Sequence, residues 1–221
     1  ELHAGEILGF FGLIGAGRTE VLKALYGATK ASSGTIELSG QSNSPSIHTS
    51  ITKGLMFCPE DRKKEGIIPI LSVQENMVIS VRRRFTRAGI FINSKKEQEV
   101  TSFFIDKLKI KTPSPQREIR FLSGGNQQKV ILSRWLAENA KILMLDEPTR
   151  GIDVGSKSEI YNLIFSLAEN GVGIIVVSSE LPEVLGLSDR IIVMRSGQAV
   201  ATVYREEASQ EKLLSLALPV S

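Results

Sequence analysis

A serine and two glycines in the second half of the chain form a candidate phosphate-binding helix start. These residues, Ser123, Gly124 and Gly125, stand just before a helical pattern over residues 129–138. Small residues at this place leave the backbone N–H groups of a helix N-terminus exposed, and the helix dipole makes that end attractive to an anion. The stretch therefore predicts contact with a phosphate group.

A pair of acids follows shortly afterwards. The apolar run at residues 142–145 predicts a buried strand, and it ends in Asp146 and Glu147. At the tip of such a strand one carboxylate can hold Mg²⁺ and the next can polarise a water molecule. We therefore expect Asp146 to support a metal ion and Glu147 to act as a general base.

A glycine-rich turn near the start of the chain offers a second phosphate site. An apolar strand pattern at residues 6–11 is followed by a loop and then by a helical pattern that starts near Val21. The loop has the order of a phosphate-binding P-loop, in which backbone N–H groups surround phosphates, a cation reaches their oxygens and a hydroxyl holds Mg²⁺. Such a turn can also be a plain tight connection, but the acids and the serine-glycine stretch downstream favour phosphate. Its candidate residues are Gly12, Gly15, Gly17, Arg18 and Thr19.

The elements around these residues alternate between strand and helix. Further strands are expected at 34–38, 54–59, 173–178, 190–194 and 199–204, with a polar loop at 41–45 and helices at 73–84, 95–108, 155–169 and 209–216. Alternation of this kind predicts an α/β fold with a mainly parallel sheet flanked by helices. The helices that separate the glycine-rich turn from the serine-glycine stretch are predicted to form an insertion. We expect a nucleotide-binding core at 1–75 and 139–221, and a helical subdomain at 76–138.

Composition excludes several other classes. The chain has 221 residues, 42% of them hydrophobic, and a formal charge of +3, which is too mild to indicate nucleic acid. No apolar run approaches the roughly 20 residues that span a bilayer. The basic cluster at 82–87 is either a solvated helix end or a docking surface. The single cysteine, Cys58, lies in an apolar run and is a better candidate for the core than for a nucleophile, and His3 and His48 have no metal-binding spacing.

Taken together, these motifs resemble those of ATP-binding-cassette (ABC) ATPases, and most closely the second ATPase half of the tandem subunits that energise bacterial monosaccharide importers. The resemblance covers nearly the whole chain. It implies a P-loop fold with an inserted helical subdomain, and further strands before residue 1 that this chain lacks, as in a piece of a longer protein. It is carried by Gly-Leu-Ile-Gly-Ala-Gly-Arg-Thr (12–19), Cys-Pro-Glu-Asp-Arg-Lys (58–63), Glu-Gly-Ile-Ile-Pro (65–69), Leu-Ser-Gly-Gly-Asn-Gln-Gln-Lys (122–129) and Asp-Glu-Pro-Thr-Arg-Gly-Ile-Asp-Val-Gly (146–155).

The resemblance also implies a role for each motif residue. Two ATPase units of this family close head to tail, so that each ATP lies between the P-loop of one unit and the signature of the other. The P-loop residues and Thr19 would then hold ATP and Mg²⁺, and Ser123 to Gln127, with Gly124 and Gly125, would meet the γ-phosphate of the opposite unit's nucleotide. Asp153 matches the segment that crosses between units.

Four positions depart from the family pattern. Arg18 stands where the P-loop lysine is usual, and the planar guanidinium is not interchangeable with a compact ammonium. Glu20 brings a carboxylate towards the phosphates, although at a helix start it also compensates the dipole. Glu60 replaces the loop glutamine that senses Mg²⁺ and contacts the membrane subunit, and Ser179 replaces the switch histidine. The resemblance therefore implies a half-active unit, whose own ATP site is degenerate and whose signature is intact.

The expected function is that of a sugar-transporting ATPase, a translocase driven by ATP hydrolysis, for a monosaccharide such as the pentose L-arabinose. Its expected partners are a second ABC ATPase domain, membrane permease subunits and, indirectly, a sugar-binding protein, at the cytoplasmic face of the bacterial inner membrane. A non-catalytic regulatory or scaffolding module remains the alternative, since the P-loop departures are also those of a vestigial site. A stand-alone P-loop kinase would leave the signature without a role.

Overall fold

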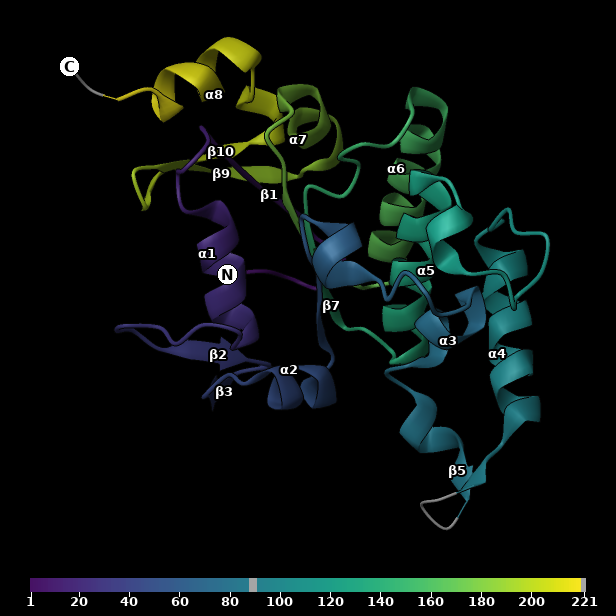
Figure 1. The fold of residues 1–221 in the computed structure, drawn as a ribbon. Coiled ribbons are helices and arrows are strands. Elements are labelled where there is room, and N and C mark those ends of the chain that lie inside the picture. Colours follow the sequence, from purple (N-terminus) through teal and green to yellow (C-terminus); the bar gives the residue numbers. More distant parts are fainter. Residues whose placement is uncertain (88–90, 220–221) are drawn as a thin grey trace. The chain divides into compact units, whose positions relative to one another are not determined.

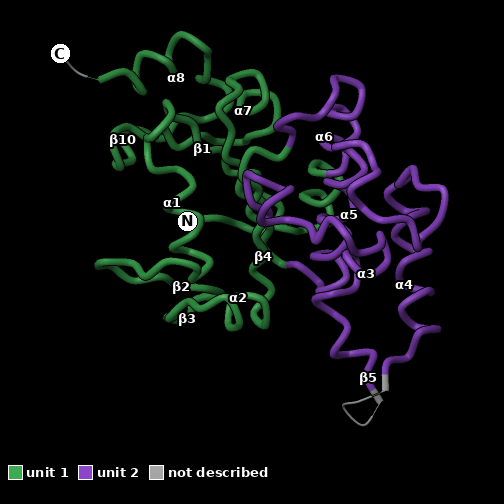
Figure 2. The backbone as a smooth tube through the Cα atoms, viewed as in Figure 1, with its two compact units in different colours: residues 1–57, 141–148, 164–221 green, residues 58–140, 149–163 purple. Residues whose placement is uncertain are grey.

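The computed structural model describes residues 1–87 and 91–219, without the side chains of Arg87 and Phe91. Its contacts divide the chain into two compact units, drawn in green and purple in Figure 2. Unit 1 comprises residues 1–57, 141–148 and 164–221, and unit 2 comprises residues 58–140 and 149–163. The subdomain bounds predicted from the sequence stay a prediction.

A mainly parallel sheet forms the frame of unit 1 (Figure 1). Its strands run in the order β10-β9-β1-β8-β7-β4. Strand β1 pairs in parallel with β8 and β9, β7 pairs in parallel with β8, and β10 is antiparallel to β9. The predicted α/β fold with a mainly parallel sheet is confirmed. The strand bounds are β1 Ile7–Gly12, β4 Leu55–Cys58, β7 Ile142–Asp146, β8 Gly173–Val177, β9 Arg190–Arg195 and β10 Gln198–Tyr204.

The two faces of this sheet belong to two hydrophobic clusters, as the alternation of side chains along a strand requires. On β1, Leu8 and Phe10 join the cluster that packs against Leu22 and Tyr26 of α1 (Arg18–Tyr26). Phe11 joins the other cluster, which includes residues of α7 (Leu181–Leu187) and α8 (Gln210–Ala217). Helix α1 therefore covers one face of the sheet, and α7 with α8 covers the other.

A hairpin and a short helix in unit 1 differ from the sequence prediction. Residues 41–43, expected to be loop, form strand β3 (Gln41–Asn43), which pairs with β2 (Ile36–Leu38). Ser39 and Gly40 both have positive φ, the geometry of a two-residue hairpin turn, so the polar stretch continues as a strand. Helix α2 (Ile47–Lys53) was not predicted and starts with a capping box at Ser46.

Unit 2 is built mainly from helices. These are α3 (Val73–Val78), α4 (Ser94–Lys107), α5 (Gly124–Ala137) and the first part of α6 (Val154–Glu169), with a short turn of helix at Arg62–Gly66 and another at Arg82–Phe85. The predicted helix over 73–84 is interrupted at 79–81, where two β-branched residues and a serine are poor helix formers, and a separate 3-10 turn follows at Arg82–Phe85. Two-residue strands at Thr86–Arg87 (β5) and Phe91–Ile92 (β6) precede α4.

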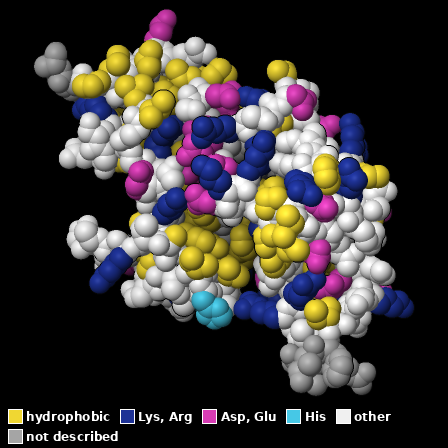
Figure 3. Space-filling view, viewed as in Figure 1, with side chains coloured by type: hydrophobic (Ala, Val, Ile, Leu, Met, Phe, Trp, Pro, Cys, Tyr) yellow, Lys and Arg dark blue, Asp and Glu magenta, His cyan; other side chains and the backbone are white. Residues whose placement is uncertain are grey.

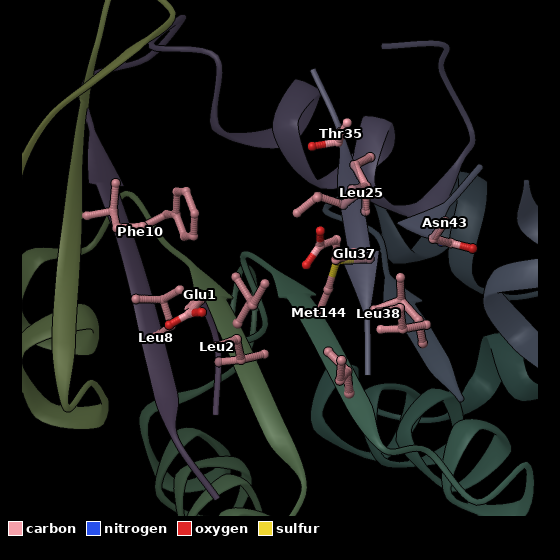
Figure 4. Close-up of a pocket in the computed structure, with 15 residues that line it drawn as sticks. Glu1, Leu2, Leu8, Phe10, Leu25, Thr35, Glu37, Leu38, Asn43 and Met144 are labelled. Atoms are coloured by element: carbon pink, nitrogen blue, oxygen red, sulfur yellow. The ribbon is translucent and has the colours of Figure 1, made fainter. Parts of the chain in front are cut away.

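A cavity of about 430 Å³ in unit 1 has a mostly apolar lining. In Figure 4, Leu8 and Phe10 of β1 and Met144 of β7 point into it, with Leu25 and Leu38 on the other side. Figure 3 shows hydrophobic side chains at the surface over this part of unit 1. A lining of this kind offers few hydrogen-bond donors to a phosphate group. No helix in the described residues is long and apolar enough to cross a membrane.

Candidate functional site

The carboxyl ends of three neighbouring strands meet at one edge of the sheet in unit 1. Gly12 ends β1, Val177 ends β8 and Asp146 ends β7, and Val177 pairs in register with both Phe10 and Asp146. In open parallel sheets this edge is where ligands bind. The sequence-predicted P-loop and acidic pair are therefore brought together.

The loop between β1 and α1 requires its glycines. Gly15 and Gly17 have φ values of +81° and +91°. A Cβ on Gly12 would come within 2.5 Å of the carbonyl oxygen of Met194, so that only glycine lets the strand end approach β9 so closely. Gly17 directly precedes α1 and has no side chain to cap it. The exposed N–H groups at this helix start suit an anion, as the P-loop prediction requires.

Arg18 lies at the start of α1 and is directed into unit 1. Its guanidinium donates from Nη1 to the carbonyl oxygen of Ser178 at 2.7 Å, and the same nitrogen is 3.8 Å from Oε1 of Glu147. Both side chains are only 10% exposed. The cation at the usual lysine position is thus engaged by the end of β8 and by the predicted general base.

Glu147 is held in an unusual backbone conformation directly after β7. Its φ is +48°, its N–H donates to the carbonyl oxygen of Val177, and its carboxylate accepts from both the backbone N–H and the hydroxyl of Ser179 at 2.7 and 3.1 Å. Burial raises the pKa of Glu147 above its usual value, against the opposing effects of the Ser179 hydrogen bonds and the Arg18 charge. A carboxyl group with a raised pKa beside a phosphate-binding loop is a typical candidate for proton transfer.

Thr19 and Asp146 supply the donors that Mg²⁺ prefers. A hydroxyl and a carboxylate are hard oxygen ligands, and Mg²⁺ commonly binds through one or two carboxylates together with substrate phosphates. Asp146 is only 1% exposed, at the end of β7. Within residues 1–87 and 91–219 no group of three or more His, Cys, Asp or Glu side chains could hold a metal ion. A hydroxyl and a carboxylate are a donor set that fits a Mg²⁺ also bound by nucleotide phosphates.

The signature stretch lies in unit 2, at the N-terminus of α5. Ser123 is the N-cap residue by position, but its hydroxyl accepts from the side chain of Asn126 at 2.9 Å and makes no cap to the helix backbone. Gln127 is 4% exposed and donates to the carbonyl oxygens of Ile119 and Leu122. Its side chain thus fixes the segment before α5, and the nucleotide contact predicted for it stays a prediction.

Gly124 and Gly125 are sterically required at the start of α5. A Cβ on Gly124 would lie 2.5 Å from Nη2 of Arg62 and 2.9 Å from the carbonyl oxygen of Gly151, and a Cβ on Gly125 would lie 2.7 Å from Cβ of Ser156. Real Cβ atoms do not approach other atoms so closely. The first residues of the signature helix therefore pack directly against the segment at 150–156.

Two arginines that sequence reasoning did not single out join this region. Arg150 forms an ion pair with Glu60, and Arg62 donates to the carbonyl oxygens of Arg150 and Gly151. Asp153 accepts a hydrogen bond from the N–H of Ser156, which lowers the pKa of its carboxyl group. Arg62 and Arg150 belong to the sequence motifs at 58–63 and 146–155, but only the packing around Gly124 shows what Arg62 contacts.

The predicted site residues thus fall into two sets. The set in unit 1 consists of Gly12, Gly15, Gly17, Arg18, Thr19, Asp146, Glu147 and Ser179, and the set in unit 2 consists of Glu60, Ser123, Gly124, Gly125, Gln127 and Asp153. Cys58 is buried in unit 2, where burial raises the pKa of its thiol to about 12, which favours a core residue over a nucleophile.

The sequence matches known proteins over its whole length. It is 56% identical to the arabinose import ATP-binding protein AraG of Paraburkholderia xenovorans (strain LB400), over 100% of this chain and 43% of that protein. It is 57% identical to an arabinose import ATP-binding protein of Burkholderia lata, over 99% of this chain and 44% of that protein. The chain therefore spans less than half the length of these curated relatives.

Solved structures and a family model agree on the fold. A dimeric ATP-binding cassette in a post-hydrolysis state bound to ADP and Pi matches with a TM-score of 0.79 at 20% identity, over 93% of this chain and 88% of that one. A nucleotide-free ATP-binding cassette from an ABC transporter matches with a TM-score of 0.82 at 18% identity, over 99% and 90%. The ABC transporter family model matches residues 1–150. The chain belongs to the ABC transporter family of ATP-binding proteins.

Proposed function

We propose that this chain is the second ATPase domain of a tandem ATP-binding subunit that energises the import of a monosaccharide. Its signature would complete the ATP site of a partner domain, while its own P-loop would bind nucleotide weakly or turn it over poorly. The sugar is a pentose such as L-arabinose, a proposal that rests on the names of the relatives. Their length, more than twice the matched share, supports a tandem arrangement.

The observation that carries the proposal is the contact between Arg18 and Glu147. A P-loop cation serves catalysis by reaching the β- and γ-phosphate oxygens. Here the guanidinium of Arg18 instead donates to Ser178 and faces Glu147, both within unit 1. Nucleotide would have to displace these contacts before Arg18 could reach a phosphate, which supports weak binding.

The same contacts bear on the general base. Glu147 accepts two hydrogen bonds from Ser179, at the place of the usual switch histidine. A serine hydroxyl cannot take up a proton at neutral pH as an imidazole can. Losing one such contact from a transition state costs roughly 10²- to 10³-fold in rate. Slow turnover at the chain's own site follows.

The signature, by contrast, retains the features of a phosphate-binding helix start. Helix α5 has 14 residues and begins with two glycines directly after the exposed Ser123, so the first residues of the helix add no large side chain of their own. The hydroxyl of Ser123 is not used as a helix cap. These groups are free of the alterations found in the P-loop, which supports their use in a partner's site.

In the proposed cycle, ATP held by the partner's P-loop would meet the signature of this chain when the two ATPase domains close. Water would attack the γ-phosphate in line, with the developing charge neutralised by Mg²⁺ and by backbone N–H groups. Closure would pull on membrane permease subunits that receive sugar from an external binding protein. The chain would then sit at the cytoplasmic face of the bacterial inner membrane.

A non-catalytic regulatory module is the second candidate, and the contacts of Arg18 with Glu147 favour it too. The two candidates differ in what the signature does. In a regulatory module the signature would not contribute to turnover at the partner's site, whereas the proposed function makes it indispensable.

The test is phosphate release by the assembled transporter with Ser123→Arg in this chain. A bulky cation at this position would block the approach of the partner's nucleotide, so we expect turnover to fall about 10²-fold or more. The matched control is Ser102→Arg, because Ser102 is an exposed serine of α4 in the same unit. Undiminished turnover with Ser123→Arg would reject the proposed function in favour of the regulatory module.

A further inference from the structure

Arg62 joins three segments of unit 2 that are far apart in the sequence. It begins the short helical turn Arg62–Gly66, which Asp61 caps by accepting from the backbone N–H groups of Lys63 and Lys64. From there its guanidinium donates to the carbonyl oxygens of Arg150 and Gly151. The same guanidinium lies against Gly124, the first residue of α5.

The closeness of this packing is set by the glycine. With 2.5 Å between Nη2 of Arg62 and the position of a Cβ on Gly124, any larger residue would force the guanidinium to shift away from this position. The carbonyl oxygen of Gly151 would be 2.9 Å from the same Cβ. Arg62, Gly124 and Gly151 therefore form one packed cluster, called here the Arg62 clamp.

The clamp sets a cation beside the positive end of a helix dipole. That placement is unfavourable by itself, and the two carbonyl oxygens that accept from Arg62 offset it. Burial also lowers the pKa of Arg62. The two hydrogen bonds to the carbonyl oxygens therefore hold the guanidinium of Arg62 at a place that its charge alone would disfavour.

A second contact, an ion pair, connects the same two segments of unit 2. Glu60 pairs with the side chain of Arg150, so residues 60 and 62 both hold the segment at 150–151. The Glu60 and Arg150 side chains are 41% and 62% exposed, and exposed ion pairs contribute little. Arg62 is therefore the stronger of the two connections.

We propose that Arg62 is a positioning residue for the signature: its guanidinium, packed on Gly124 and bonded to the carbonyls of Arg150 and Gly151, makes the start of α5 follow the segment at 60–62. The inference rests on the proposed function, because it assumes that the start of α5 meets a partner's nucleotide. A movement of residues 60–62 would then shift the start of α5 through Arg62 and so reorient the N–H groups of the signature.

The first test measures kcat and KM for ATP in the assembled transporter with Arg62→Ala and Arg62→Lys. Misplacing a catalytic group by about 1 Å costs up to roughly 10²-fold, so we expect kcat to fall about 10-fold or more for both variants. KM should change little, because the signature contacts nucleotide only in the closed state. Lysine should not restore kcat, since one ammonium cannot reproduce the planar two-carbonyl contact. The control is Lys63→Ala, an exposed neighbour.

The second test asks whether Arg62 and Gly124 are coupled, and it does not depend on turnover. Gly124→Ala should lower the unfolding midpoint of the chain, and its effect should be smaller in the Arg62→Ala background, where Nη2 no longer blocks the new methyl group. Fluorescence of Trp135, the only tryptophan of the chain, reports the midpoint in unit 2.

The outcomes separate the two proposals. If Ser123→Arg abolishes turnover but Arg62→Ala leaves kcat within 2-fold of the wild type, the inference about Arg62 is wrong and the proposed function stands. Strictly additive effects at positions 62 and 124 would overturn the clamp itself. If Ser123→Arg has no effect, the proposed function fails first, and the inference fails with it.

Discussion

Arg134 is a buried charge that connects α5 with α3 and with the turn Arg62–Gly66. It is 8% exposed and donates from Nε to the carbonyl oxygen of Asn76 at 2.7 Å and from Nη1 to that of Gly66 at 2.9 Å, all within unit 2. A weaker contact of 3.4 Å joins Nη2 to the side chain of Asn76. We predict that Arg134→Met substantially destabilises unit 2.

The magnitude follows from the two short bonds. Hydrogen bonds to a charged group contribute about 1.5–3 kcal/mol each when one partner is removed. Methionine retains much of the aliphatic volume, and removal of the guanidinium also ends the cost of burying a charge, which offsets part of the loss. The net expected decrease in the free energy of unfolding is about 2–4 kcal/mol.

Urea unfolding followed by Trp135 fluorescence measures this decrease, because Trp135 adjoins Arg134 in α5 and is the only tryptophan. The matched control is Arg83→Met, which removes an exposed arginine of the same unit and should change the free energy by no more than about 0.5 kcal/mol. A loss below about 1 kcal/mol for Arg134→Met would refute the claim that these bonds hold α5 in place.

Three further predictions concern other sites. Gly9→Ala should cost about 1–3 kcal/mol in thermal unfolding, because its methyl group would lie 2.2 Å from Oγ of Ser188, whereas Gly186→Ala, with nothing within 4 Å, should be neutral or slightly stabilising. Ser72→Ala removes the capping box of α3 and should lower stability by about 1 kcal/mol; an unchanged denaturation midpoint would count against it. Because burial raises the pKa of Glu147, the folded chain binds this proton more tightly than the unfolded chain. Compared with Glu147→Gln, the wild type should therefore have its full stabilising contribution from Glu147 below about pH 4.5 and lose it as the pH rises through the pKa of the folded chain. Urea unfolding of both proteins from pH 4 to 8 measures this, and a difference in unfolding free energy that does not change with pH would contradict it.

Much of the fold could be predicted because strong local patterns agree with the tertiary structure. Strands such as β1 and β8 are short apolar runs bounded by turn residues, and the pairing of parallel strands follows from the helices between them. Strand β3 was missed because its polar residues carry no alternating pattern, and only the left-handed turn at Ser39 and Gly40 makes it pair. Helix α2 could have been found from the serine and threonine spacing at 46–49.

Candidate site residues could be predicted where a residue type stands at a fixed spacing, as in the P-loop and the signature, and their contact with nucleotide stays a prediction. Contacts across the sequence could not be predicted. Nothing near Arg18 indicates that its guanidinium donates to Ser178, and nothing near Gly124 indicates that Arg62 lies against it. Such contacts depend on which distant segments the fold brings together, and local sequence patterns do not show this.

Calorimetric titration of the chain with Mg-ATP shows whether its own ATP site is degenerate, as we propose. The same sample is then assayed for phosphate release beside a Glu147→Gln control. We expect weak binding and at most slow turnover, because Arg18 lies 3.8 Å from Glu147 and because Glu147 accepts a hydrogen bond from a serine hydroxyl, which cannot take up a proton as an imidazole can. Firm binding together with turnover that Glu147→Gln abolishes would contradict it.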